Sequence, residues 1–354
     1  MNVEKLRLKN FRNISFSELD FDNKTNVICG ENAQGKTNII EALWLFSGAK
    51  SFRISNDSQF IKFGENRSEI YTEYKIFGVN NSAKITFGEK KTAYLNEKKL
   101  PSTANLAGKY NAVIFSPSDL TLVTDGPDKR RRFLDTAIGQ LYQNYIEILR
   151  GYNRAVMQRN KIIKDYRYDK TLSVMLDVFE NEIAESGNKI IKYRKKYIEI
   201  LNRYVNDIYF GISCGKEEIK TEYIESKGET LNCEMLKNAR EKDMYTQTTS
   251  IGPHRDDINF KINGISARIY GSQGQKRSVA LAIKLAGAEV IKEISGEYPI
   301  CLLDDVMSEL DEGRQNYILN HIKNWQSFIT CCDTSNIKNL KDGKIIRIKN
   351  GDKI

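Results

Sequence analysis

Near its start the chain carries an eight-residue stretch that is compatible with few local structures. It consists of Gly30, Glu31, Asn32, Ala33, Gln34, Gly35, Lys36 and Thr37, and it follows the pattern glycine, any four residues, glycine, lysine, threonine without a mismatch. In such a loop the backbone N–H groups point into one concavity, and the following helix adds its positive N-terminal end. Lys36 supplies a cation for terminal phosphates, and the Thr37 hydroxyl supplies a ligand for magnesium. The stretch therefore predicts a nucleoside triphosphate site.

The sequence on either side of this loop agrees with that prediction. Thr25–Cys29 is a short run with high β-propensity, and 38–46 carries helix-forming, largely apolar residues. Strand, loop and helix thus follow one another in the required order. An ordinary surface turn would also use the glycines, but it would leave Lys36 and Thr37 unexplained.

Length and composition narrow the class of protein. A chain of 354 residues exceeds the size at which single cores usually stop growing, so we expect one domain with an inserted lobe, or two domains. No apolar run approaches the roughly 20 residues that span a bilayer, and residues 1–11 lack an apolar stretch of signal-peptide length. We therefore expect no membrane contact and a location inside the cell.

The charge and the cysteines add two weaker indications. A formal net charge of +9 favours a polyanionic partner such as nucleic acid, although a solvated basic surface would give the same composition. The cysteines have no metal-binding spacing, and we interpret them as reduced and mostly structural; they are Cys29, Cys214, Cys233, Cys301, Cys331 and Cys332.

Short strands dominate the first third of the chain. Strand patterns cover Val3–Leu8, Ile14–Phe21 and Asn26–Cys29, separated by Asn and Asp turns. Residues 66–100 alternate between apolar and polar side chains with turn residues between the runs, which predicts an antiparallel meander. Ala112–Phe115 is a further strand candidate.

A helical region follows. Residues 129–205 contain no proline and carry apolar residues at helical spacing, so two or three long helices are expected. The polar segment Asp165–Thr171 predicts the tip of an antiparallel helical arm. A basic tract on this arm is a candidate DNA contact, although a charge run on a helix is more often a solvated face; it contains Lys189, Lys192, Tyr193, Arg194, Lys195, Lys196 and Tyr197.

Short strands are expected again from Gly211 onward, including Ile258–Ile262. Before that last strand stands the dense polar turn GPHRDD at 252–257. His254 has no partner spacing for zinc or for a nucleophile, so a hydrogen-bonded turn residue is the leading interpretation. Arg255 is left open as a phosphate contact.

The segment Pro299–Asp305 predicts the second half of the nucleotide site. It is an apolar strand that ends in two carboxylates, the form of a Walker B segment. We assign Asp304 to magnesium and Asp305 to polarising an attacking water, which requires a carboxylate within hydrogen-bond reach. An apolar strand ending in two acids is a weak signal alone, but it is a strong one beside a phosphate loop.

A second anion-binding loop is predicted at Gly271–Ser278, where Ser272, Gln273, Gly274 and Gln275 open a helix that runs to Ile294. One nucleotide has little need of two such loops. We therefore expect this loop to contact the triphosphate of a second subunit, so that two chains enclose two nucleotides. An ordinary N-capped helix is the alternative.

The motifs together resemble a known family. GENAQGKTN, GSQGQ, LLDD and SELD, the last running from Ser308 to Asp311, are similar to the ABC-type ATPase heads of the SMC group. FSPSDL at 115–120, GPDKRRRFLD at 126–135, GPHRDD at 252–257 and DDVMSELDEGRQNYIL at 304–319 resemble the RecF family of bacterial recombination mediators. The resemblance covers nearly the whole chain.

This resemblance implies an α/β fold. It would be an ABC-type P-loop ATPase head, with a mixed sheet, flanking helices and an antiparallel β-subdomain, plus an inserted α-helical lobe with a short antiparallel arm. The head would comprise 1–118 and 250–354 and the inserted lobe 119–249, with the helix that follows loop 271–278 packed between the lobes. Residues 30–37 would bind ATP in cis and Ser272 to Gln275 in trans, while Ser308 and Asp311 would belong to a D-loop.

The family further implies an ATP-dependent DNA-binding homodimer of the cytoplasm and nucleoid. It would act at single-stranded or gapped DNA with RecO and RecR to help load RecA. Two departures suggest a slow, weak, DNA-stimulated ATPase. Ser116 stands where the ABC group usually has a glutamine, and 329–333 offers only threonine or cysteine for a switch histidine.

Two rival functions remain open. A transporter-type ATPase head would need a membrane partner and normally the switch histidine. A scaffold that binds ATP without hydrolysing it would tolerate the loss of Asp305.

Overall fold

The computed structural model describes residues 1–354 except 55, 167–168, 228–229, 333–342, 350–351 and 354. Asp333, the last residue of the segment searched for a switch histidine, lies outside the described residues. No helix within the described part of the chain is both long and apolar enough to cross a membrane.

The P-loop candidate follows a strand of a mostly parallel sheet. The strands are β3 (Thr25–Cys29), β8 (Ala112–Phe115), β12 (Ile300–Leu303), β13 (Ser327–Cys331), β14 (Lys344–Lys349) and β15 (Asp352–Lys353). Their order is β15-β14-β3-β13-β12-β8, and every neighbouring pair except β15-β14 is parallel. Because the carboxyl ends of parallel strands meet at one edge, the segments after β3, β12 and β13 lie together.

A second sheet forms the predicted β-subdomain. Its strands are β1 (Asn2–Phe11), β2 (Ile14–Asp20), β4 (Ser68–Ile76), β5 (Val79–Phe87), β6 (Thr92–Leu95) and β7 (Lys98–Leu100). All of its pairs are antiparallel, in the order β2-β1-β4-β5-β6-β7. The strands predicted near the N-terminus and the meander at 66–100 are therefore confirmed.

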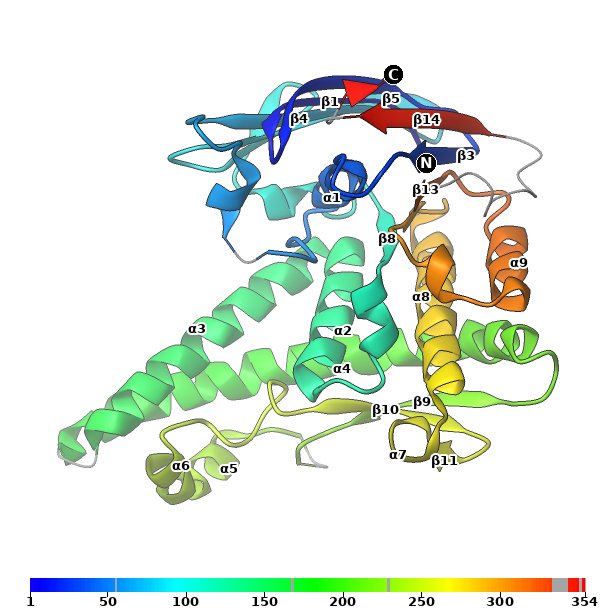
Figure 1. The fold of residues 1–354 in the computed structure, drawn as a ribbon. Coiled ribbons are helices and arrows are strands. Elements are labelled where there is room, and N and C mark those ends of the chain that lie inside the picture. Colours follow the sequence, from blue (N-terminus) through cyan, green and yellow to red (C-terminus); the bar gives the residue numbers. More distant parts are fainter. Residues whose placement is uncertain (55, 167–168, 228–229, 333–342, 350–351, 354) are drawn as a thin grey trace.

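Helix α1 (Lys36–Leu45) lies between the two sheets (Figure 1). Its Ile39 and Leu43 belong to one buried apolar cluster that includes Leu6 of β1, in the antiparallel sheet. The same cluster contains Ile28 of β3, in the parallel sheet. The helix after the P-loop candidate is thus fixed by apolar packing on both sides.

Three long helices make up the predicted helical region: α2 (Pro127–Leu141), α3 (Gln143–Tyr166) and α4 (Ser173–Ile212). Helices α3 and α4 form the antiparallel arm, which extends away from the sheets (Figure 1). The predicted tip, Asp165–Thr171, falls between them, although residues 167–168 lie outside the described part of the chain.

The sequence-based end of the helical region was wrong. Strands were expected from Gly211, but this glycine lies in the last turn of α4. A Cβ added there would lie 2.3 Å from Cε2 of Tyr317, so the glycine allows α4 to approach that ring closely. Its role is helix packing and not helix termination.

The remaining elements connect the arm to the parallel sheet. They are β9 (Ile219–Ile224), α5 (Cys233–Asn238), α6 (Arg240–Thr246), β10 (Asp257–Ile262), β11 (Ile265–Ser266), α7 (Ala267–Tyr270), α8 (Gln273–Ser295) and α9 (Glu312–His321). Short 3₁₀ helices are η1 (Asp57–Phe60), η2 (Thr103–Leu106), η3 (Pro117–Thr121), η4 (Lys170–Leu172) and η5 (Met307–Glu309). Strands β9 and β10 pair across the predicted division at 249/250, and the division itself stays a prediction.

Candidate nucleotide site

The backbone of the P-loop candidate has the shape that its glycines predict. Ala33 and Gly35 have positive φ values of 66° and 101°, a region that glycine enters without steric cost. A Cβ at Gly30 would lie 2.4 Å from the backbone oxygen of Ile348 in β14, so no side chain fits there. The loop therefore needs its glycines for backbone conformation and for close packing.

Lys36 lies inside this loop. Its side chain is buried, and its ammonium donates hydrogen bonds to the backbone oxygens of Gly30 at 2.6 Å and Glu31 at 2.9 Å. The Cys332 thiol lies 3.7 Å from the same nitrogen. A cation held at the first residue of a helix, beside the positive end of the helix dipole, favours an anionic ligand at this position.

The two carboxylates of the Walker B candidate stand at the end of β12. Asp304 is buried, and burial raises the pKa of its carboxyl to about 6, an effect that a hydrogen bond with Thr37 opposes and the charge of Asp305 reinforces. Asp305 has a φ of 52°, which is unusual for a residue other than glycine. The sequence-predicted pair Thr37 and Asp304 is thus brought into contact.

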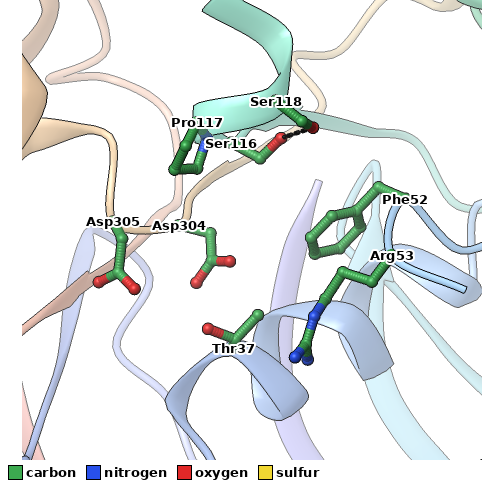
Figure 2. Close-up of a pocket in the computed structure, with 8 residues that line it drawn as sticks. All are labelled: Thr37, Phe52, Arg53, Ser116, Pro117, Ser118, Asp304 and Asp305. Atoms are coloured by element: carbon green, nitrogen blue, oxygen red, sulfur yellow. Dashed lines mark hydrogen bonds between the residues drawn. The ribbon is translucent and has the colours of Figure 1, made fainter. Parts of the chain in front are cut away.

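These residues surround one cavity of about 270 Å³. Figure 2 shows Asp304 pointing toward Thr37, with Asp305 on one side and Phe52 and Arg53 on the other. Ser116, Pro117 and Ser118 close the cavity from above in this view. An arrangement of two acids, one hydroxyl and one guanidinium can hold a divalent cation together with phosphate oxygens.

Phe52 and Arg53 were missed by sequence reasoning. Arg53 is held by the amide oxygen of Asn38 at 2.8 Å and lies 3.8 Å from Oε2 of Glu41, which is fully buried. Glu41 also accepts hydrogen bonds from Arg12 at 2.8 to 3.1 Å. No motif marks Arg53 in the sequence, because its neighbours in the site come from other segments.

The region of Ser116 does reach the cavity, as its alignment with the ABC glutamine suggests. The backbone N–H and hydroxyl of Ser116 donate to Asp119 at 2.9 and 2.8 Å. Lys284 of α8 forms an ion pair with the same carboxylate at 2.8 Å. Helix α8 is therefore tied to the loop that lines the cavity.

The second loop does not join this cavity. Ser272 caps α8, accepting a hydrogen bond from the N–H of Gln275 at 3.2 Å, and the Gln275 side chain accepts one from the Ser272 N–H at 2.7 Å. Ser272 precedes Lys284 by 12 residues, which corresponds to about 18 Å along a helix. In Figure 1 the start of α8 lies beside α7 and β11, far from α1. Among the described residues, the chain does not bring its two anion-binding candidates together.

The D-loop candidate lies between these two places. Ser308 donates to the backbone oxygen of Asp305 at 2.9 Å, while Asp311 caps α9. Arg314, also paired with Asp311, donates to Ser278 of α8 at 2.8 Å and to the backbone oxygen of Gly274 at 3.3 Å. The segment thus connects the Walker B candidate with the start of α8.

The motifs GPDKRRRFLD and GPHRDD contact each other. Arg130 is buried and forms hydrogen bonds of 2.6 and 2.9 Å with both carboxylate oxygens of Asp257. The His254 ring is hydrogen-bonded to the Tyr152 hydroxyl at 2.5 Å and to the Thr249 backbone oxygen at 2.9 Å, in agreement with the turn-residue interpretation. These residues hold α2, α3 and β10 together.

The basic tract on α4 is only partly available to a ligand. Arg194 and Tyr197 are buried, and Arg194 pairs with Asp135 at 2.8 Å. Lys189 and Lys195 form ion pairs with glutamates, each at 2.6 Å. The buried Arg194 and Tyr197 are therefore not accessible to DNA in this structure, and DNA contact by the tract stays a prediction. Its exposed members remain candidates for DNA contact, among them Lys192 and Lys196.

The cysteines lie partly in the core and partly at the surface. All six have free thiols; Cys29, Cys301 and Cys331 are buried. Burial raises the pKa of the Cys301 thiol, which makes it a poor nucleophile.

Comparisons with known proteins show what this chain is similar to. The family described as RecF/RecN/SMC N-terminal domain matches residues 2–353. A Clostridium perfringens protein named DNA replication and repair protein RecF is 41% identical over 364 aligned positions, which cover 99% of each chain. A solved structure described as the recombination mediator protein RecF with ATP is 36% identical, with a TM-score of 0.90 over 100% of this chain and 97% of that one. The Smc head domain from Pyrococcus furiosus, 17% identical, shares the fold with a TM-score of 0.57 over 99% of this chain and 95% of that chain.

Proposed function

This chain belongs to the RecF family of DNA replication and repair proteins, an SMC-like group with the ABC-type ATPase fold, and from that premise we propose that ATP clamps two copies of it into a DNA-binding dimer. The dimer would bind single-stranded or gapped DNA and junctions with little sequence preference. Its cellular role would be recombinational repair and replication restart, in the cytoplasm and at the nucleoid.

The residues at the P-loop suit the triphosphate of ATP. The backbone N–H groups of 30–37 and the Lys36 ammonium offer donors to phosphate oxygens, and Gly30 and Gly35 keep the backbone free of side chains. The Lys36 ammonium donates to two backbone oxygens. Phosphate oxygens carry charge and are therefore stronger acceptors for this ammonium than the two backbone oxygens. The relative of known structure is described with ATP bound.

The donor set also suits magnesium. Thr37 and Asp304 present a hydroxyl and a carboxylate, the hard oxygen ligands that this ion prefers. A buried carboxylate with a raised pKa gains stability when a cation is placed beside it. Bound magnesium would neutralise charge on the phosphate oxygens. Asp305 would then accept a proton from, or orient, the attacking water.

One observation carries the dimer proposal. The cavity is lined by Thr37, Asp304 and Asp305. Lys284 of α8 pairs with Asp119 in the loop beside this cavity, whereas Ser272 opens the same helix about 18 Å away from Lys284. A helix start that cannot serve its own chain's nucleotide is available to the nucleotide of a second chain. Two-fold symmetry then gives two equivalent composite sites.

Two further observations support the proposals that this chain binds DNA and that it works with partner proteins. The net charge of +9 favours a polyanion. The ATP-bound relative is described as working in the RecFOR pathway. We extend this to the present chain and propose that it works with RecO and RecR to help load RecA.

We further propose that hydrolysis is slow and weakly stimulated by DNA, with ATP acting mainly as a switch for dimerisation. Ser116, whose hydroxyl is hydrogen-bonded to Asp119, lines the cavity in place of a residue with a longer amide side chain. A scaffold that binds but does not hydrolyse ATP remains the second candidate. Asp305→Asn separates the two, because it should slow turnover strongly in an ATPase and change nothing in a scaffold.

The direct test is the mass of the full-length protein in solution, by light scattering, with and without ATP, magnesium and a gapped DNA. The proposal expects a monomer mass without nucleotide and a dimer mass with ATP. If the protein binds ATP but its mass in solution is the same with and without ATP, ATP-dependent dimerisation would be contradicted.

A further inference from the structure

Thr330, near the end of β13, touches both carboxylate residues of the site. Its hydroxyl lies 3.1 Å from Oδ1 of Asp304 and 3.2 Å from Oδ1 of Asp305. It also accepts a hydrogen bond of 2.8 Å from the backbone N–H of Asp305. The side chain is 2% exposed, so water does not compete for these contacts.

The strand fixes the position of this hydroxyl. Thr330 is paired in register with Ile28 of β3, two residues before the P-loop, and β13 also pairs with β12. A β-branched side chain has few χ1 choices in a strand. The hydroxyl is therefore held between the strand that leads into the P-loop and the strand that leads into Asp304.

The hydrogen bond between Thr330 and the Asp305 N–H stabilises an unusual backbone conformation at Asp305. Asp305 has a φ of 52°, a conformation that residues with a Cβ adopt rarely and that must be maintained by their surroundings. The hydrogen bond from its N–H to Thr330 maintains it, together with the bond from Ser308 to its backbone oxygen. With the backbone held in this way, the carboxylate of Asp305 lines the cavity.

The Thr330 hydroxyl cannot donate to both carboxylates at once. A threonine hydroxyl has one proton and two lone pairs, so it can accept from the Asp305 N–H and donate to one carboxylate at a time. The other carboxylate is then left with its charge available for a different partner. One hydroxyl thus separates the two acids into different hydrogen-bonding roles.

We propose that Thr330 is the positioning residue that holds Asp304 and Asp305 in the geometry needed for ATP hydrolysis. The inference rests on the proposed function, because it takes Asp305 as the group that acts on water. Thr330 itself is not a catalytic residue, since it acts through the two acids.

The test compares Thr330→Val, which keeps the shape and removes the hydroxyl, with Thr330→Ser, which keeps the hydroxyl. In full-length protein with saturating ATP and magnesium, Thr330→Val should lower kcat by about 100-fold, the order expected when a reacting group is misplaced. Its KM for ATP should stay within about threefold, because a positioning defect acts on turnover more than on uniform binding. Thr330→Ser should recover most of the rate.

A matched control is Ser327→Ala in the same strand, which removes a buried hydroxyl that contacts Thr25 at 3.1 Å and lies away from the two acids. It should leave kcat unchanged. If Thr330→Val turned over at the parental rate, or if Thr330→Ser were as slow as Thr330→Val, the inference would be wrong.

A double-mutant cycle separates this inference from the proposed function. If Thr330 acts through Asp305, adding Thr330→Val to Asp305→Asn should cause little further loss. Independent, multiplicative losses would overturn the positioning role. Parental turnover in Asp305→Asn alone would instead contradict the assignment of Asp305 in the proposed function.

Discussion

The ammonium of Lys284, in the middle of α8, lies 2.8 Å from a carboxylate oxygen of Asp119 and donates to the backbone oxygen of Ile114 at 3.0 Å. Asp119 in turn holds Ser116 at the cavity. Helix α8, whose first turn is proposed to contact a partner's nucleotide, is therefore joined through Lys284 to the loop that lines the nucleotide cavity of its own chain.

Lys284→Met is expected to lower the free energy of unfolding by about 1–3 kcal/mol, because it leaves the partly buried Asp119 charge without its cation. Urea unfolding measures the change. The control is Lys189→Met, which removes an exposed partner of Glu185 and should cause a much smaller loss, because water screens that pair. If both variants lost the same free energy of unfolding, the Lys284–Asp119 pair would contribute no more to stability than an exposed pair.

The buried His254 should make stability depend on pH. Burial lowers the pKa of this imidazole to about 4, whereas an unfolded histidine has a pKa of about 6.5. Between these values the unfolded chain binds the extra proton, so stability falls as pH falls from about 6.5 to about 4, by up to about 3 kcal/mol. The contribution is constant above and below that window.

The measurement is urea unfolding of the parent and His254→Gln across pH 4 to 7. The chain's other histidine, His321, is present in both proteins and cancels in the difference. The stability difference between parent and variant should change across this window in the stated direction. A difference that does not vary with pH would contradict the assignment.

DNA affinity should fall steeply with salt. Neutralising about five phosphates gives a slope near −4.5 in log K against log salt, so doubling the salt should weaken binding about 20-fold. Fluorescence anisotropy with a gapped duplex measures this, and a second duplex of unrelated sequence should give a similar curve. Affinity that barely responds to salt would argue against a protein that contacts the backbone.

Much of the site could be predicted from sequence because its motifs are local. The P-loop needs residues at fixed spacing, and the Walker B candidate is one apolar strand followed by two acids, so the sequence alone locates both. Arg53, Thr330 and Lys284 could not be assigned roles, because their contacts join segments far apart in the chain. The end of the helix at Gly211 was predicted wrongly because this glycine does not end the helix. It leaves room for the ring of Tyr317, which is distant in the sequence.

Ser272→Arg is expected to block ATP-dependent dimerisation while leaving ATP binding intact. Arginine would fill the space at the start of α8 that a partner's phosphate would approach, and the P-loop of the same chain is remote from it. Light scattering and a nucleotide-binding assay measure the two properties. Ser272→Ala is the control, since it loses the helix cap but stays small and should still dimerise.

A shared ATP site, built from the P-loop of one chain and the start of α8 of another, is tested by mixing two variants that are each inactive alone. Lys36→Met should lose ATP binding in its own P-loop, and Ser272→Arg should fail to complete a partner's site. In a mixed dimer, Lys36 of one chain faces Ser272 of the other, so one intact site forms. We expect the mixture to hydrolyse ATP well above the sum of the two variants measured alone. A mixture no more active than that sum would contradict the shared site.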